Sequence, residues 1–137
     1  RGFLQVLDSG KIHLFKSHNP KYADGDQERD FLYVKDAVEM TLFFLDNPKT
    51  GGIFNAGTGV ARTWNDLAAA VFKAMDRKVA VEYIEMPISI RSQFQYRTCA
   101  KIDKIRSVGY SQLITSLEEA TTDYIQNYLL SNKRLSR

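Results

Sequence analysis

The sequence predicts a single α/β domain over residues 1–137, with short strands and about four to five helices. Three patterns support this prediction. Apolar residues alternate with other residues over 79–84, which is the period of a strand. They recur at helical spacing over 64–76, just after a Thr that would cap the helix. The run 28–36 passes from strand-forming residues directly into a helical pattern.

The composition is ordinary for a globular protein and argues against nucleic-acid-binding and membrane proteins. Hydrophobic residues make up 44% of the chain and charged residues 26%, and a chain of this length buries roughly two-thirds of its unfolded surface. The net charge of +3 is interspersed, with Lys133-Arg134 the nearest approach to a basic block, so we predict no nucleic-acid partner. No apolar run approaches the ~18–20 residues that span a bilayer, and no signal peptide is visible, so we predict no membrane partner. The lone cysteine, Cys99, cannot form an intrachain disulfide, which fits a reducing, cytoplasmic location.

The N-terminal part is expected to form a helix, a strand and a long loop. Residues 1–9 show the spacing of a helix that ends at Gly10, and 12–15 have the composition of a short strand. The polar loop 16–28 contains two turn signals, and loops of this length often carry function. The two histidines of the chain have no acidic or cysteine residue at a ligand-like spacing, so we predict no metal site.

The middle of the chain is expected to form a buried helix and a glycine-rich turn. The helix spans about 36–46 with Asp36 as its cap, and its apolar residues cover most of the circumference, which predicts burial on several sides. A short strand over 53–56 then leads to Gly57-x-Gly59. This spacing lacks the third glycine of a dinucleotide-binding loop, so we interpret the glycines as a tight turn with exposed backbone.

Residues 88–99 are expected to be irregular, and they leave two alternatives open. Arg91 and Arg97 are interleaved with Phe94 and Tyr96. The arginines could hold a phosphate while the rings stack on a base or a sugar. Equally, the segment could be a surface loop that packs its aromatic rings inward. Two further helices, the last behind a Ser-x-x-Glu capping box, complete the chain.

Arg29 is the first candidate for a functional residue. It stands at the entry of the predicted strand, just after the long loop. A guanidinium held by a strand presents a fork of donors that suits a phosphate or a carboxylate. The alternative is an ordinary surface ion pair with Glu28 or Asp30.

The run 29–37, Arg-Asp-Phe-Leu-Tyr-Val-Lys-Asp-Ala, resembles a signature in the C-terminal half of the extended short-chain dehydrogenases/reductases. The resemblance implies the C-terminal substrate-binding portion of a Rossmann-type enzyme, in which Arg29 contacts a nucleotide sugar. Residues 14–27 and 52–59 are further similar to a group of epimerases in this family that invert C6 of an ADP-activated heptose for lipopolysaccharide biosynthesis. That similarity implies an NADP-dependent isomerase, with substrate contacts at Phe15, Lys16, Ser17, His18, Arg29 and Phe94. The group commonly has tyrosine where Phe94 stands and aspartate where Lys101 stands.

The catalytic parts of such an enzyme are expected upstream of this sequence. No tyrosine has a lysine four positions on, and no glycine-rich dinucleotide loop is present, so we assign no catalytic or cofactor-binding residue to this chain. The sequence begins at Arg1, and we expect a missing N-terminal dinucleotide-binding domain to bind NADP. We predict that the chain alone is inactive and, with an apolar face and a strand edge exposed, oligomerises. The alternatives are another nucleotide-sugar epimerase or dehydratase of the same family, and a binding remnant without catalysis.

Overall fold

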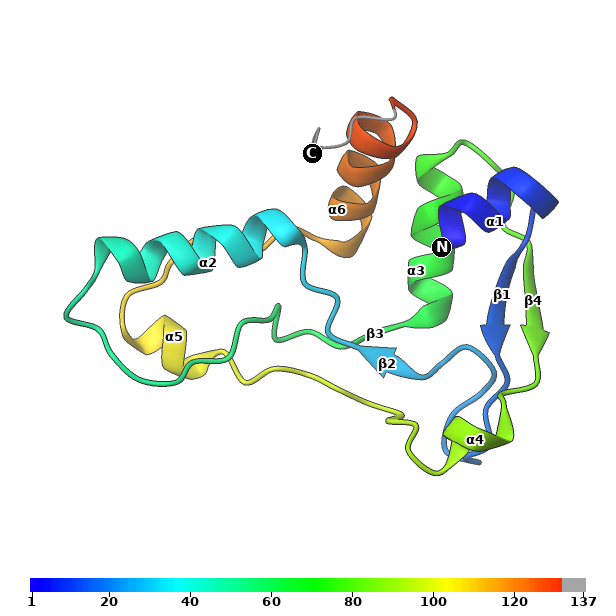
Figure 1. The fold of residues 1–137 in the computed structure, drawn as a ribbon, viewed down its shortest axis with the longest axis horizontal. Helices are drawn as coiled ribbons and strands as arrows, with labels where there is room; N and C mark the ends of the chain where they lie inside the picture. Colours follow the sequence, from blue (N-terminus) through cyan, green and yellow to red (C-terminus); the bar gives the residue numbers. More distant parts are fainter. Residues whose placement is uncertain (132–137) are drawn as a thin grey trace.

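In the computed structural model, which describes residues 1–131, short strands and helices alternate along the chain (Figure 1). The basic pair Lys133-Arg134 lies outside the described residues. The predicted α/β class is confirmed, and the six α-helices within residues 1–131 exceed the predicted four to five because α4 forms inside the segment expected to be irregular. The elements in chain order are α1 (Gly2–Ser9), β1 (Ile12–Phe15), β2 (Glu28–Arg29), α2 (Val34–Asp46), β3 (Arg62–Thr63), α3 (Trp64–Ala74), β4 (Val81–Ile84), α4 (Ile88–Arg91), α5 (Asp103–Ser107), α6 (Leu117–Tyr124) and the π-helical turn η1 (Ile125–Leu129).

Two small sheets organise the chain. β1 and β4 pair in parallel along their whole lengths, so their C-terminal ends lie at the same edge. β2 and β3 pair antiparallel over two residues each. The strand predicted from residue 28 is therefore shorter than expected, because residues 30–33 carry no strand pairing and α2 begins at Val34.

The larger core lies in the sheet lobe, which consists of α1, β1, α3, β4, α6 and η1 (right half of Figure 1). Local signals set its helix ends as predicted. Gly10 adopts a φ of 73° and ends α1, a conformation that glycine adopts without strain. Reciprocal capping boxes begin α3, at Thr63 and Asp66, and α6, at Ser116 and Glu119. The helices and β1 bury one cluster, formed by Val6, Ile12, Leu14, Ala68, Val71, Phe72, Ala74 and Ile125.

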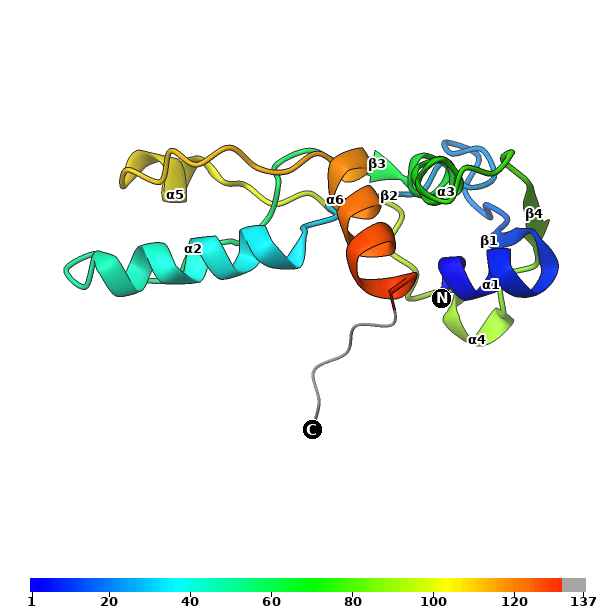
Figure 2. The ribbon, with the colours of Figure 1, turned by 90° about the horizontal axis from the view of Figure 1, so that it is seen from above.

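A second, smaller cluster lies in the helical lobe, which consists of α2 and α5 (left half of Figures 1 and 2). Its buried members are Met40, Ile105 and Tyr110. α2 buries only this face, and its opposite side is exposed at Val34, Val38, Leu42 and Leu45. Burial of α2 on several sides is therefore a wrong prediction for residues 1–131, which cover one face of the helix.

Two further predictions about the helical lobe are wrong. Tyr33, not Asp36, is the N-cap of α2, and no side chain caps the helix. Asp36 instead is buried in the first turn, where its carboxylate accepts hydrogen bonds from the Thr115 amide (3.0 Å) and hydroxyl (2.8 Å). Residues 53–56 form no strand, because no described strand lies alongside them, and Ile53 is 89% exposed.

Helix length bears on membrane insertion. The longest helix, α2, has 13 residues, whereas a helix needs about 20 apolar residues to span a bilayer. Within residues 1–131, none of the helices combines enough length with enough apolar character to cross a membrane.

Candidate functional site

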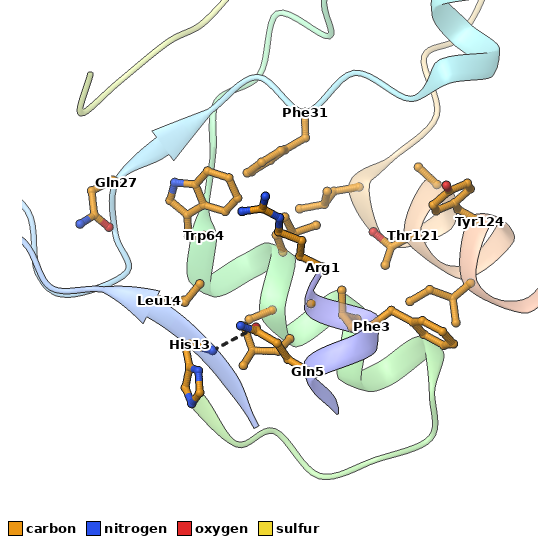
Figure 3. A pocket seen from close by; sticks show the side chains of 18 of the residues that line it. Arg1, Phe3, Gln5, His13, Leu14, Gln27, Phe31, Trp64, Thr121 and Tyr124 are labelled. Carbon is orange, nitrogen blue, oxygen red and sulfur yellow. Dashed lines mark hydrogen bonds between the residues drawn. The ribbon is translucent and has the colours of Figure 1, made fainter. Parts of the chain in front are cut away.

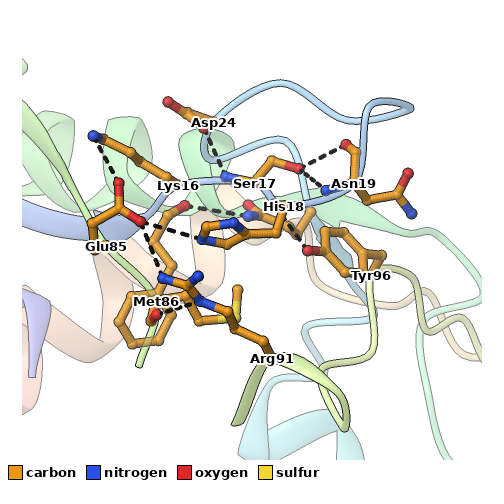
Figure 4. A network of polar contacts seen from close by, with 11 residues as sticks. Lys16, Ser17, His18, Asn19, Asp24, Glu85, Met86, Arg91 and Tyr96 are labelled. Carbon is orange, nitrogen blue, oxygen red and sulfur yellow. Dashed lines mark hydrogen bonds and ion pairs between the residues drawn. The ribbon is translucent and has the colours of Figure 1, made fainter. Parts of the chain in front are cut away.

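The parallel pairing of β1 and β4 brings two distant segments together at one edge of the sheet. β1 leads into residues 16–18, and β4 leads into Glu85 and α4 (Figure 4). The Lys16 amide donates to the Ile84 carbonyl oxygen (2.9 Å), so the pairing continues just past β1. Ligands of α/β proteins commonly bind beyond the C-terminal ends of parallel strands. This edge is therefore where the predicted loop residues can meet a ligand.

Phe15, Arg29 and Phe94, three of the predicted site residues, form one stack. The rings of Phe15 and Phe94 meet edge to face, with centroids 6.5 Å apart. The Arg29 guanidinium carbon lies 5.2 Å from the centroid of the Phe94 ring, within cation–π range. The structure thus brings a cation and two aromatic rings from three separate segments into contact.

Arg29 has no carboxylate partner among residues 1–131. One of its terminal nitrogens donates to the Glu28 carbonyl oxygen (2.7 Å), while the Glu28 carboxylate pairs with Arg97 (2.8 Å). The alternative of an ion pair between Arg29 and Glu28 or Asp30 is therefore wrong. Partial burial lowers the pKa of the Arg29 guanidinium, and a partly desolvated cation gains from an anionic ligand.

Lys16 and His18 share a carboxylate that the sequence analysis did not identify. The Glu85 carboxylate lies 3.0 Å from Lys16 Nζ and 3.4 Å from His18 Nε2, and it also pairs with Arg91 (3.2 Å) (Figure 4). Its hydrogen bond and charge raise the pKa of the Lys16 ammonium, and the bond from Lys16 lowers the pKa of Glu85. The partner was missed because Lys16 and Glu85 lie 69 positions apart and meet only through strand pairing.

Ser17 lies between Lys16 and His18 in the chain, and hydrogen bonds hold its backbone in place. Its amide donates to Asp24 Oδ1 (2.7 Å), and its hydroxyl donates to the Asn19 carbonyl oxygen (2.9 Å). The buried side chain of Gln27 donates a hydrogen bond to the Phe15 carbonyl oxygen (3.2 Å), which connects the end of the loop to its start. These hydrogen bonds hold both ends of the loop. All six predicted site residues lie at this edge of the sheet.

The segment 88–99 packs its aromatic rings inward. The Tyr96 hydroxyl accepts a hydrogen bond from the His18 amide (3.0 Å), and its ring contacts those of Tyr22 and Phe94 with centroids 5.4 Å away in each case. Both arginines of the segment already pair with glutamates, Arg91 with Glu85 and Arg97 with Glu28. The structure thus favours inward packing of the rings, and a phosphate contact by the arginines stays a prediction.

The glycine-rich turn at 57–59 is filled by a carboxylate of the chain itself. Asp30 accepts hydrogen bonds from the amides of Thr58 (2.7 Å), Gly59 (3.1 Å) and Ala100 (2.9 Å), and from the Thr58 hydroxyl. Burial raises the pKa of Asp30, but these bonds outweigh it and hold the pKa below its usual value. A Cβ atom on Gly57 would lie 2.3 Å from the Ala100 Cβ, so the close approach requires glycine.

A largely apolar cleft of about 680 Å³ opens between α1, β1, α3 and α6 (Figure 3). Phe15 and Phe94 of the predicted site form part of its wall, so the cleft adjoins the Arg29 stack. Sequence reasoning missed this cleft, because its lining comes from helix faces that pattern alone assigns to a closed core. Other lining residues include Phe3, Leu14, Phe31, Trp64, Thr121 and Tyr124.

The histidines lie near acidic residues of β4 and the residue after it. His13 is 3.8 Å from Glu82 and His18 is 3.4 Å from Glu85. Within residues 1–131, no three side chains from His, Cys, Asp and Glu are grouped so that they could hold a metal ion.

Comparisons with known proteins relate this chain to nucleotide-sugar enzymes. Residues 4–57 match the profile of the NAD dependent epimerase/dehydratase family. ADP-L-glycero-D-manno-heptose-6-epimerase of Nitratidesulfovibrio vulgaris (strain DP4) is 49% identical over 129 residues, which cover 94% of this chain and 40% of that protein. The same enzyme of Fusobacterium nucleatum is 44% identical over 131 residues, again 40% of its length. The chain thus spans about 40% of the length of the curated relatives it matches.

Solved structures show the same fold. The heptose epimerase of Helicobacter pylori superposes with a TM-score of 0.71 at 24% identity, over 91% of this chain and 35% of that chain. A UDP-N-acetylglucosamine 4-epimerase from Methanobrevibacter ruminantium M1 superposes with a TM-score of 0.77 at 17% identity, over 96% of this chain and 38% of that chain. The TM-scores show a shared fold. The sequence identities are too low to identify the substrate.

Proposed function

This chain belongs to the NAD-dependent epimerase/dehydratase family, and on that premise we propose that it forms the substrate-binding part of an ADP-heptose 6-epimerase. The reaction would invert C6 of ADP-D-glycero-D-manno-heptose to give the L-glycero form, for lipopolysaccharide biosynthesis. The observation that carries the proposal is the half-buried Arg29, which lies on the Phe94 ring without a carboxylate partner in residues 1–131.

Each part of the site would have a separate task. Arg29 presents parallel N–H donors, which suit the two oxygens of a phosphate group in the ADP-sugar diphosphate. Phe15 and Phe94 supply an apolar surface against which a base or a sugar ring packs. Ser17 and His18 add polar groups to the loop, and such groups suit the hydroxyls of a sugar. These roles need no proton or hydride transfer by the chain itself.

The residues of this chain do not fit the cofactor NADP. The amides of the 57–59 turn, which a pyrophosphate would require, donate to Asp30. No tyrosine in the sequence has the lysine four positions on that would lower its pKa for acid/base catalysis. We therefore place cofactor binding and the chemical step in a separate dinucleotide-binding domain and expect no turnover by this chain alone.

Two apolar surfaces are suited to contact with that domain. One is the 680 Å³ cleft, and the other is the exposed side of α2, where Leu45 is 69% exposed. Apolar surfaces of this extent usually mark an interface. In the proposed enzyme they would be covered, which also positions the Arg29 stack beside the cofactor.

Calorimetric titration of the chain with ADP-mannose, a commercially accessible ADP-sugar, tests the proposal. We expect saturable binding, weaker binding of UDP-glucose and GDP-mannose, and a loss of about tenfold or more in affinity for Arg29→Ala, because a charge-assisted bidentate contact is removed. Arg97→Ala is the matched control, because this nearby arginine is already paired with Glu28.

Two outcomes would contradict the proposal. One is a folded chain that binds none of the three nucleotide sugars. The other is ADP-mannose binding that is weakened equally by Arg29→Ala and Arg97→Ala, which would point to general charge rather than to a defined contact. A preference for UDP-glucose would keep the site and change the substrate.

A further inference from the structure

Three nitrogen-bearing side chains surround the Glu85 carboxylate. Its Oε1 atom accepts a hydrogen bond from Lys16 Nζ (3.0 Å). Its Oε2 atom lies 3.4 Å from His18 Nε2 and 3.2 Å from a terminal nitrogen of Arg91. Figure 4 shows the side chains of Lys16, His18 and Arg91 converging on this carboxylate from two different segments. Proteins hold a phosphate group in the same way, with nitrogen donors around its oxygens.

Structural stabilisation does not account well for this cluster. The Glu85 side chain is 60% exposed, and exposed ion pairs contribute little to stability. The donors, in contrast, are held by the fold. Lys16 follows β1 directly, and Arg91 Nε donates to the Met86 carbonyl oxygen (2.8 Å), which orients its guanidinium independently of Glu85. The Arg91 guanidinium can therefore stay in place when the carboxylate leaves.

A similar cluster earlier on the same two strands provides an internal comparison. Glu82 lies 3.0 Å from Lys11 Nζ and 3.8 Å from His13 Nε2. No arginine pairs with Glu82 among residues 1–131, and this cluster contacts none of the predicted substrate-binding residues. The added arginine and the contact with the site loop thus distinguish the Glu85 cluster.

We propose that Lys16, His18 and Arg91 form an anion site that Glu85 occupies, and that the diphosphate of a bound nucleotide sugar displaces the Glu85 carboxylate. This inference rests on the proposed function and deepens it, because Glu85 then limits ligand affinity. The displaced carboxylate would turn into solvent, to which it is already exposed. Tyr96 links this cluster to the Arg29 stack, because its hydroxyl accepts a hydrogen bond from the His18 amide and its ring contacts that of Phe94.

Titration with inorganic pyrophosphate at low ionic strength tests this inference. We expect Glu85→Gln to bind pyrophosphate about five- to tenfold more tightly than the unaltered chain, because the competing negative charge is gone. Glu82→Gln, which removes the same charge from the comparison cluster, should change the affinity by less than about twofold. Glu85→Asp retains the charge and should bind weakly, like the unaltered chain.

A second substitution tests whether the gain depends on Lys16 and Arg91. Adding Lys16→Gln or Arg91→Gln to Glu85→Gln should remove the gain in pyrophosphate affinity. Pyrophosphate affinity that is unchanged or lower in Glu85→Gln, in a chain with an unaltered circular dichroism spectrum, would overturn the inference, since Glu85 would then not compete with the anion.

A parallel titration with ADP-mannose separates this inference from the proposed function. If Glu85→Gln gains pyrophosphate affinity while no variant binds ADP-mannose, the anion site stands and the proposed substrate fails. If ADP-mannose binding depends on Arg29 but is the same in Glu85→Gln and the unaltered chain, the proposed function stands and the displacement of Glu85 is refuted.

Discussion

The sheet lobe and the helical lobe differ in how many apolar residues each one buries. The sheet lobe buries eight apolar residues between helices and strands, among them Val6 and Phe72, which are fully buried. The helical lobe buries three, and four apolar residues of α2 are exposed. Both lobes contain similar apolar helices, so the difference teaches that an apolar helix is buried only as far as its neighbours supply surface.

Carboxylates connect the two lobes. Asp36 in α2 holds Thr115, which precedes α6. Asp123 in α6 accepts hydrogen bonds from the Tyr33 hydroxyl and from Lys35 (2.7 Å), at the start of α2. Burial, together with the bond to Asp123, raises the pKa of Tyr33 to about 12. The lobes are thus joined by directed polar contacts, whereas each lobe is held internally by apolar packing.

The largest effect on the free energy of unfolding is expected from a cavity in the core of the sheet lobe. Phe72→Ala should reduce the free energy of unfolding by about 3–5 kcal/mol, because it leaves a cavity among fully buried neighbours. Ile105→Ala in the helical lobe should cost less, about 2–3 kcal/mol, since the smaller cluster can collapse more easily. Urea unfolding of both variants measures the difference, and an equal or larger cost at Ile105 would contradict the comparison between the lobes.

The next largest effect on stability is expected at the glycine turn 57–59, between the two lobes. Gly57→Ala should cost about 2 kcal/mol or more, because the added Cβ would overlap Ala100 and press on the Asp30 carboxylate. Gly51→Ala is the matched control, since open space surrounds that position and the change should stay within about 0.5 kcal/mol. Thermal unfolding compares the pair, and equal stabilities would show that the turn relaxes freely.

A smaller effect is expected from the polar contacts at Asp123. Hydrogen bonds from Lys35, then Tyr33 and Asn127, hold its pKa at about 2, below the usual 3.8. A depressed pKa stabilises the fold above the unfolded-state value, so this contribution is present above about pH 4 and is lost as the pH falls to about 2. Asp123→Asn should therefore be less stable than the unaltered chain at pH 6 and converge with it near pH 2.

Chemical denaturation at a series of pH values measures that convergence. Asp8→Asn is the control, because Asp8 is exposed and makes no ion pair among residues 1–131. A stability difference between the Asp123 variant and the unaltered chain that stays constant from pH 6 to pH 2 would assign the effect to packing instead of charge.

The smallest effect on stability is expected at the exposed face of α2. Leu45→Glu should change the free energy of unfolding by less than about 0.5 kcal/mol, because the side chain is already in solvent. It should reduce the predicted self-association, since it places a charge within the exposed apolar face. Sedimentation velocity measures this, with the exposed Ser9→Glu as a charge-matched control; a monomeric unaltered chain would count against the prediction.

Local signals predicted much of the fold because they act between neighbours in the chain. The cap at Gly10, the Thr63–Asp66 box and the Ser116–Glu119 box each depend on a few adjacent residues. The site was predicted differently, since physical argument left Arg29 with two alternatives, and the resemblance to a family selected it together with the other residues. The local prediction that Asp36 caps α2 failed, because the Asp36 carboxylate is held by Thr115, which lies 79 positions away.

By itself, the sequence determined the end of α1, the starts of α3 and α6, and the absence of a Tyr-x-x-x-Lys pair. Only the tertiary structure decided which charges meet. Arg29 has no carboxylate partner in the described chain. Glu85 pairs with Lys16 and His18, and Asp30 accepts hydrogen bonds from the amides of the glycine turn. The physical reason is that helix and strand patterns arise from local geometry, whereas the partner of a charge depends on which strands pair and at which edge their ends lie.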